Sequence, residues 1–194
     1  ANQCVGCRRC EAACTVRNDG KGSAYISRIK VSRNLQYGAR GVTASYGTGD
    51  GQMGNFFIVA DTCRQCEKPP CVKVCPVRTT YREPDGIVVI DYNWCIGCRM
   101  CVSACPYWAR RFNWGEPNLP AEEMNPVTHY LGNRPRMKGV AEKCTFCLQR
   151  TRQGRYTACV EVCPVGARKF GNLLDPESEV RKILEKKRVF RLKA

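Results

Sequence analysis

The stretch CIGCRMCVSACP, from Cys95 to Pro106, places four cysteines within eleven residues and follows the last one with a proline. Its spacing is C-x₂-C-x₂-C-x₃-C-P. A disulfide stabilises most when it closes a long loop, so thiols this close do not suit a disulfide framework. Structural zinc sites typically use two short pairs separated by a longer spacer. The spacing instead predicts an iron–sulfur site, in which three thiolates bind one cluster and the fourth cysteine binds another.

The chain contains four such groups, which together use all sixteen of its cysteines. Groups one and three have the full spacing, group two has two extra residues, and group four has a longer internal loop. Proline follows the last cysteine of three groups, while Thr15 takes this place in group one. We therefore predict four [4Fe–4S] clusters as cofactors, bound by Cys4, Cys7, Cys10, Cys14, Cys63, Cys66, Cys71, Cys75, Cys95, Cys98, Cys101, Cys105, Cys144, Cys147, Cys159 and Cys163.

Chain length suggests which groups share clusters. Only 20 positions separate Cys75 from Cys95, enough for one hairpin, so groups two and three should form one unit and groups one and four should pair across it. Four ligand sets follow: Cys63, Cys66, Cys71 with Cys105; Cys95, Cys98, Cys101 with Cys75; Cys4, Cys7, Cys10 with Cys163; and Cys144, Cys147, Cys159 with Cys14. The competing assignment pairs group one with two and group three with four.

The predicted fold class is α+β, with two nested bacterial-ferredoxin-like units built from short hairpins and one-turn helices. Residues Thr79–Glu83, the turn Pro84-Asp85-Gly86 and residues Ile87–Asp91 are typical of a hairpin. Strands are also expected in NFFIVADTC, YISRIKV and YWARRFNW. The segments VKVC, VSAC and VEVC should each form one helical turn, because the proline after each cysteine disfavours a longer helix.

These elements suggest a division of the chain. Residues 1–36 and 140–174 would form the outer unit and residues 55–114 the inner unit, with loop insertions at 37–54 and 115–139 and a helix and tail at 175–194. Long loops in a compact domain are usually functional or disordered, so we expect the two insertions to serve as interface arms. The last helix should span Asp175–Arg188, with Asp175 as its cap, Pro176 at its first position, and an apolar face of Val180, Ile183 and Leu184.

Charge and hydropathy exclude several classes of protein. The formal charge is +15, but four [4Fe–4S]²⁺ clusters with their thiolates would reduce it to about +7. With that correction, and without interleaved basic and aromatic residues, we expect no nucleic-acid partner. No apolar run is long enough to cross a bilayer. No nucleophile–base pair or phosphate-binding glycine loop is recognisable, so we expect an electron carrier and not an enzyme.

Some other residues have roles that depend on their surroundings. Arg8, Arg9, Lys68, Lys73, Arg99 and Lys143 lie within or beside the cysteine groups, where a positive charge would raise a cluster's potential unless solvent screens it. Trp94, Tyr107, Trp108 and Trp114 flank group three and are expected to pack over the clusters. Gly6 and Gly97 would let the backbone approach sulfide closely. His129, the only histidine, is expected to be an ordinary loop residue.

Sixteen cysteines in this order resemble the four-cluster electron-transfer subunits of the dimethyl-sulfoxide-reductase and polysulfide-reductase type, over essentially the whole chain. The resemblance implies the nested pairing, no substrate site in this chain, and a partner that is either a molybdopterin catalytic subunit or a membrane subunit of the polysulfide-reductase anchor kind. Some relatives replace one group-three cysteine with tryptophan and carry a three-iron cluster. Here all four cysteines are present.

Part of the chain is similar to one branch of this family, the exported iron–sulfur subunit of the Dsr membrane complex. The similar part runs from NPVTHYLGNRPRMKG through CTFCLQRTRQGRYTACVEVCPVGARKFGNLLDPESEV and is followed by KRVFRLK. That branch implies a quinone-interacting membrane subunit and a multihaem cytochrome c as partners. It also implies a periplasmic location, or the outer face of the cytoplasmic membrane, reached through a twin-arginine signal. Because the chain opens ANQC, without the strand that leads into groups two and three, we expect a further segment before it.

Overall fold

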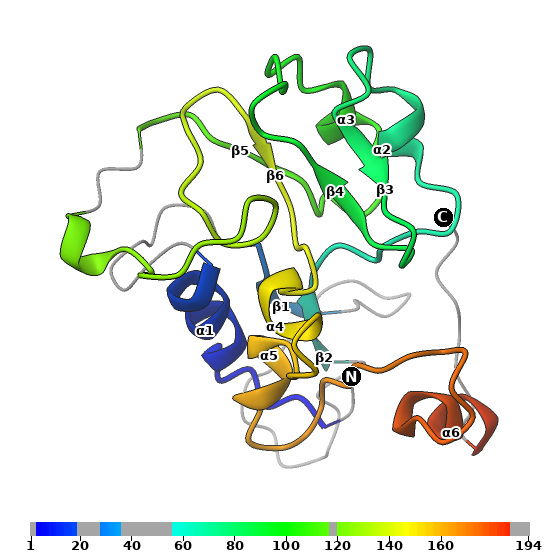
Figure 1. The fold of residues 1–194 in the computed structure, drawn as a ribbon. Coiled ribbons are helices and arrows are strands. Elements are labelled where there is room, and N and C mark those ends of the chain that lie inside the picture. Colours follow the sequence, from blue (N-terminus) through cyan, green and yellow to red (C-terminus); the bar gives the residue numbers. More distant parts are fainter. Residues whose placement is uncertain (1–2, 19–27, 36–55, 117–119, 187–194) are drawn as a thin grey trace.

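The structure, a computed structural model, describes residues 3–18, 28–35, 56–116 and 120–186 (Figure 1). The upper half of the molecule in Figure 1 contains α2 (Pro70–Lys73), α3 (Met100–Ser103), β3 (Thr80–Arg82), β4 (Val88–Ile90), β5 (Arg111–Phe112) and β6 (Ala141–Glu142). The lower half contains α1 (Arg9–Asn18), α4 (Leu148–Thr151), α5 (Ala158–Glu161), β1 (Lys30–Leu35) and β2 (Phe56–Asp61). Segments from both ends of the sequence thus meet in one half.

Within the described ranges, the strands form three two-stranded antiparallel sheets. The predicted hairpin of β3 and β4 is confirmed, with Tyr81 opposite Val89. The strands expected in YISRIKV and NFFIVADTC pair with each other as β1 and β2, so that Lys30 lies opposite Asp61. The strand expected after group three has only two residues, β5, and it pairs with β6, which directly precedes group four. This last pair connects the end of the predicted inner unit to the segment that leads into group four.

Short helices occur where cysteine–proline pairs predict them. Helices α2, α3 and α5 have four residues each and end before the last cysteine of their group. In contrast, α1 has ten residues and runs through both Cys10 and Cys14. Thr15 explains the difference, because it continues the helix at the position where the other groups have proline, which disfavours helical backbone in the residue before it. Its hydroxyl donates to the carbonyl of Glu11, one turn earlier.

The apolar core is built around β4, whose three residues are all buried. Val88 and Ile90 face a cluster that includes Tyr92, Cys71 and Cys101. Val89, which points to the opposite face of the strand, packs against Leu131 and Leu148. The uninterrupted apolar run Ile87–Ile90 therefore reflects a strand covered on both faces, as is typical of strands without a solvent side.

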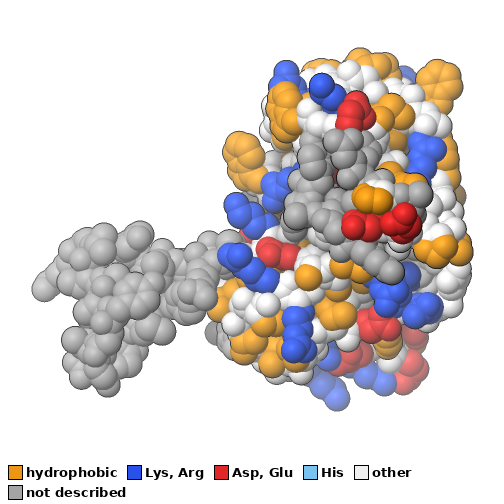
Figure 2. Space-filling view, turned by 90° about the vertical axis from the view of Figure 1, so that its left-hand side faces the viewer, with side chains coloured by type: hydrophobic (Ala, Val, Ile, Leu, Met, Phe, Trp, Pro, Cys, Tyr) orange, Lys and Arg blue, Asp and Glu red, His pale blue; other side chains and the backbone are white. Residues whose placement is uncertain are grey.

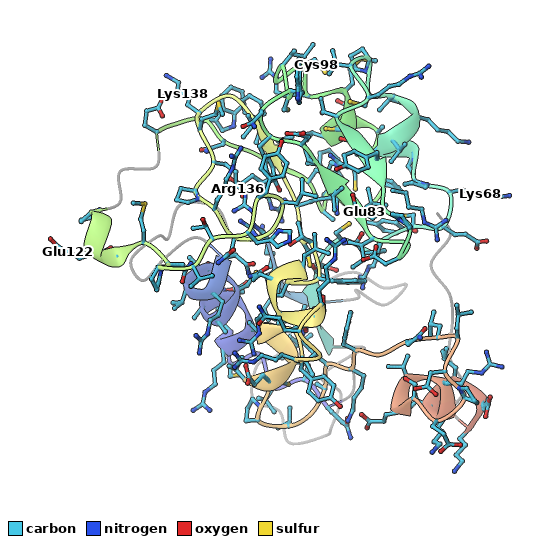
Figure 3. The ribbon with its side chains drawn as sticks, in the orientation of Figure 1. Lys68, Glu83, Cys98, Glu122, Arg136 and Lys138 are labelled. Atoms are coloured by element: carbon cyan, nitrogen blue, oxygen red, sulfur yellow. The ribbon has the colours of Figure 1, made fainter. Side chains whose placement is uncertain are left out.

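A buried ionic network joins the two halves of the molecule. Glu142, in β6, forms ion pairs with Arg28 at 3.3 Å and with Arg136 at 3.7 Å, and all three side chains are almost fully buried. The guanidinium of Arg136 also stacks on the ring of Tyr92, 4.7 Å from its centroid, and points into the interior in Figure 3. A charge this deep is tolerated because it is paired on several sides.

Two expectations for the insertions and the C-terminal helix need correction. Leu131, Asn133 and Arg136 are buried, so the second half of the loop 115–139 is part of the packed body and is not an arm. The first insertion, 37–54, lies outside the described residues. Helix α6 (Glu179–Lys186) begins four residues later than predicted, because the Asp175 carboxylate accepts from the amide of Glu177 and so caps a turn. No side chain of α6 is fully buried.

None of the helices in the described ranges has the length and apolar character that a transmembrane span needs.

Candidate iron–sulfur sites

The four cysteine groups share an unusual backbone conformation. In each C-x-x-C loop the residue before the second cysteine has a positive φ: Gly6, Gln65, Gly97 and Phe146. The third residue after each Cys-Pro cysteine also has a positive φ: Arg78, Trp108 and Gly166. Residues other than glycine rarely adopt this backbone conformation, which costs them about 1–3 kcal/mol and occurs mainly at functional sites. Loops with such a turn can present successive backbone N–H groups as a concave nest, a geometry that favours anions such as iron–sulfur clusters.

Four cysteines line a small cavity in the upper half of the molecule. Its walls include Thr80, Ile90 and Ala141, and its thiols belong to Cys75, Cys95, Cys98 and Cys101. We call these four cysteines the Cys98 set. Cys98 is exposed and lies at the upper edge of the molecule in Figure 3. The structure thus brings the last cysteine of group two to the first three of group three.

A second small cavity lies near the first, since Cys71 and Cys101, which line one cavity each, belong to the same apolar cluster. It is lined by Cys63, Cys66, Cys71 and Cys105, the Cys66 set, together with Val88, Tyr107 and Arg110. Burial and the neighbouring thiols of Cys63, Cys71 and Cys105 raise the pKa of Cys66, which places these four sulfurs close enough to interact electrostatically. Here the last cysteine of group three joins the first three of group two.

In the lower half, Cys14 lies with Cys144, Cys147 and Cys159, the Cys147 set. The amide nitrogen of Asn18 is 3.5 Å from Cys14 Sγ and 3.9 Å from Cys147 Sγ, so one buried side chain contacts both. Burial raises the pKa of the Cys147 thiol, and the nearby Cys144 and Cys159 raise it further. Cys14 and Cys159 also share an apolar cluster.

The remaining cysteines, Cys4, Cys7, Cys10 and Cys163, form the Cys7 set, which is the most open. Cys163 borders a surface hollow together with Arg9 and Ala12 on the first turns of α1. Cys7 is exposed. The hollow that Cys163 borders is lined by neither Cys4 nor Cys7, so the pairing of Cys163 with these two cysteines stays a prediction.

Neighbouring sets meet in a fixed order. Cys101 of the Cys98 set lies near Cys71 of the Cys66 set. Cys144 of the Cys147 set lies near Cys63 of the Cys66 set. Cys10 of the Cys7 set lies near Cys159 of the Cys147 set. The four sets therefore form a row, Cys98–Cys66–Cys147–Cys7, and the two exposed cysteines belong to its two ends.

The donor atoms suit a cluster ligand. Burial would raise the pKa of the Cys75 thiol, but hydrogen bonds from Thr80 and Thr79 lower it below its ordinary value. The same holds for the pKa of Cys163, where burial is outweighed by backbone amides of Arg168, Ala167 and Val165. Iron–sulfur clusters bind the thiolate, and their potentials depend on such hydrogen bonds. Among the described residues no three His, Cys, Asp or Glu side chains converge as ligands of a single metal ion would.

Of the six cations expected near the clusters, only Lys143 is buried, whereas Arg8, Arg9, Lys68, Lys73 and Arg99 are exposed. Two other cations, whose position the sequence pattern did not indicate to us, also face the thiols. Arg110 lies next to Cys71 and Cys101, and Arg168 next to Cys159 and Cys10. Both end the pattern C-P-x-x-A-R, in Cys105–Arg110 and Cys163–Arg168, and this repeat could have identified them.

The expected packing of aromatics over the clusters is wrong for the tryptophans. Trp94, Trp108 and Trp114 are all exposed, whereas Tyr107 lines the cavity of the Cys66 set. Figure 2 shows apolar side chains at the surface of the upper end, with Lys and Arg between them. The Nδ1 atom of His129 accepts a hydrogen bond from the Leu131 amide, as in an ordinary loop histidine.

Comparison with known proteins agrees with the cysteine pattern. The family described as "4Fe-4S dicluster domain" matches residues 54–125 and 94–167, and a "4Fe-4S binding domain" matches residues 1–17. The chain is 42% identical over 186 residues to a putative dimethyl sulfoxide reductase iron-sulfur subunit of Halobacterium salinarum, covering 94% of this chain and 67% of that protein. It is 39% identical over 208 residues to a selenate reductase subunit of Mesobacillus selenatarsenatis, covering 98% and 64%.

A third relative has a different name. The chain is 46% identical over 141 residues to the Hdr-like menaquinol oxidoreductase iron-sulfur subunit 1 of Archaeoglobus fulgidus, covering 68% of this chain and 51% of that protein. The chain spans about half to two thirds of the length of these three curated relatives. These matches define a class of ferredoxin-like iron–sulfur proteins that transfer electrons within reductase complexes. The chain belongs to the iron–sulfur subunits of the dimethyl-sulfoxide-reductase and polysulfide-reductase type, and it carries multiple [4Fe–4S] clusters.

Proposed function

We propose that this chain conducts single electrons along a row of four [4Fe–4S] clusters, held by the Cys98, Cys66, Cys147 and Cys7 sets in that order. The observation that carries this proposal is the exposure of Cys98 and Cys7, one at each end of the row. A carrier between two partners needs an accessible site at both ends and shielded sites between them. The clusters supply the one-electron chemistry, and the chain positions and tunes them.

The proposed ligand sets are supported by the two cavities and by the Asn18 contacts. They assign residues 55–114 to an inner unit and residues 1–36 with 140–174 to an outer one. Cys75→Ser should then perturb the cluster of Cys95, Cys98 and Cys101, and Cys105→Ser that of Cys63, Cys66 and Cys71. Electron paramagnetic resonance (EPR) of the reduced protein distinguishes the two. If Cys75→Ser instead altered the same signal as Cys63→Ser, the exchange of fourth ligands would be refuted.

At its ends, the carrier would connect a quinone-interacting membrane subunit of the polysulfide-reductase anchor type to a second redox subunit. In the Dsr-type arrangement that second subunit is a multihaem cytochrome c, and the complex lies at the outer face of the cytoplasmic membrane. The relative named as a menaquinol oxidoreductase subunit favours the quinone partner. The chain itself would have no substrate site.

The two reductase relatives favour an alternative in which the second subunit is a molybdopterin reductase. Gentle solubilisation of native membranes under argon, followed by mass spectrometry of the proteins that co-purify with this chain, decides between the two. Recovery of a multihaem cytochrome with a polytopic membrane subunit supports the Dsr-type complex. Recovery of a molybdopterin subunit supports the alternative, and recovery of neither partner refutes both.

A further inference from the structure

Three cations, of which Arg110 and Lys143 are buried and Arg168 is half-buried, lie at different steps of the row of cysteine sets. Arg110 lines the cavity of the Cys66 set and donates to Thr80, which lines the cavity of the Cys98 set. Lys143 contacts Gln65 in the loop of the Cys66 set and the carbonyl of Cys144 in the Cys147 set. Arg168 donates to the carbonyl of Ala60, which packs in one apolar cluster with Cys159 of the Cys147 set and Cys10 of the Cys7 set. We call these three residues the gap cations.

Among the described residues, no carboxylate forms an ion pair with Arg110, Lys143 or Arg168, although such a group normally pairs a buried charge. Arg110 is 3% exposed, its Nη1 donates to the hydroxyl of Thr80 at 3.3 Å, and its buried Nη2 has no hydrogen-bond partner. Arg168 donates from Nη1 to the carbonyl of Ala60 at 3.1 Å, while its buried Nε has none. Burial lowers the pKa of Arg110 and Arg168, but the thiols of Cys71 and Cys159, which also accept hydrogen bonds from them, raise it overall. The cysteine sulfurs are therefore acceptors for these guanidinium groups.

Lys143 is fully buried, and its ammonium donates to the carbonyl of Cys144 at 2.8 Å and to the side-chain oxygen of Gln65 at 3.4 Å. Gln65 belongs to the C-x-x-C loop of group two, and its amide also donates to the Cys144 carbonyl at 2.8 Å. The lysine is therefore fixed where the loops of two sets meet. Its two neutral acceptors do not balance its charge.

We propose that the gap cations are shared counter-charges, each of which stabilises the reduced state of the two sets on either side of it. This inference rests on the proposed function, because it requires the four sets to bind clusters. A one-electron transfer between neighbouring sets moves one negative charge from one side of the cation to the other, with no proton or bond change. A charge placed between donor and acceptor therefore raises both potentials and leaves little difference between them.

The proposal makes a specific prediction for redox titrations of the purified holo-protein, monitored by EPR. Arg110→Gln, Lys143→Gln and Arg168→Gln should each lower two of the four midpoint potentials. The Arg110 and Lys143 variants should share one lowered potential, the Lys143 and Arg168 variants should share another, and the Arg110 and Arg168 variants should share none. Arg110→Lys, which keeps the charge, should restore both potentials.

Lys73→Gln is the matched control, because Lys73 lies between two cysteines of group two but is exposed and screened by solvent. It should leave all four potentials in place. The proposal is overturned if the glutamine variants shift no potential, or if the Arg110 and Arg168 variants lower the same one. Should one variant fail to assemble, the other two still test the pattern. A wild-type protein without four redox centres would refute the proposed function itself, whereas four centres that ignore the substitutions would refute only the role of the cations.

Discussion

Arg110 donates a hydrogen bond to the hydroxyl of Thr80, and these two residues occupy equivalent positions, five after Cys105 and five after Cys75. The segments that follow groups two and three therefore meet at the boundary between the Cys98 and Cys66 sets. Thr80 begins β3 and lines the cavity of the Cys98 set, while Arg110 lines that of the Cys66 set. One polar contact thus links the two halves of the inner unit.

Thr80→Val should destabilise the protein by about 1.5–3 kcal/mol, because it removes the acceptor of a buried charged donor. Valine is suited to a strand, so loss of β propensity does not contribute. Thr80→Ser keeps the hydroxyl and should cost only about 1 kcal/mol for the lost methyl. Urea unfolding of the anaerobic holo-protein, followed by its visible absorption, gives the comparison. An equal loss of unfolding free energy in both variants would show that the hydrogen bond to the Thr80 hydroxyl does not contribute to stability.

Glu142→Gln should be the more damaging change, at about 3–5 kcal/mol, because it removes the carboxylate that forms ion pairs with both buried Arg28 and buried Arg136. The matched control is Glu83→Gln, whose partner Arg152 is well exposed and also contacts Asp85. Such a pair contributes about 0–1 kcal/mol. The same unfolding measurement applies. A Glu142 variant as stable as the control would mean that the network does not hold the two halves together.

Much of the site could be predicted from the sequence because cluster binding depends on short-range spacing. The cysteine groups, the hairpin after Cys75 and the one-turn helices before each Cys-Pro are all local features. Local signals also misled. Asp175 and Pro176 resemble a helix start, but the Asp175 carboxylate caps a turn first, and α6 begins at Glu179.

What the sequence did not reveal depends on contacts between distant segments. Arg110 looks like an ordinary surface residue, and its burial follows only once groups two and three fold together. Similarly, Leu131 and Asn133 belong to a proline-rich stretch that resembles a free loop, but Leu131 packs against β4. The tryptophans around group three show the reverse error, because apolar residues near a cluster suggested burial and all three are exposed. Local pattern does not determine which face of a loop meets the core.

Iron release should occur in two phases, because Cys98 and Cys7 are exposed while the Cys66 and Cys147 sets lie between them. Under mild oxidation with a chelator, we expect roughly half of the iron to leave quickly, since solvent access governs cluster lability and potential. The EPR signals lost first should be those altered by Cys98→Ser and Cys7→Ser. Loss of all signals at one rate would contradict a row with two open ends and a shielded centre.

Gly97 should not tolerate a side chain, for two reasons that the structure separates. Its φ is +69°, and a Cβ there would lie 2.2 Å from the carbonyl oxygen of Gly139. That backbone is held in place, because the Gly139 amide donates to the carbonyl of Asn113 at 2.7 Å. The sequence suggested that a glycine is needed here so that the backbone can approach a cluster sulfide. In the structure, the close approach of the Gly139 carbonyl is by itself a sufficient reason for a glycine at position 97.

Gly97→Ala should therefore combine the cost of a left-handed backbone, about 1–3 kcal/mol, with a similar cost of overpacking. Gly154→Ala isolates the first term, because Gly154 has a φ of +73° and a Cβ added there would meet no atom within 4 Å. We expect Gly154→Ala to keep its full iron content and Gly97→Ala to lose the cluster of the adjacent Cys98 set. Iron analysis and urea unfolding of both variants measure the difference. If both lost stability equally and kept all their iron, the contact with Gly139 would be irrelevant to the site.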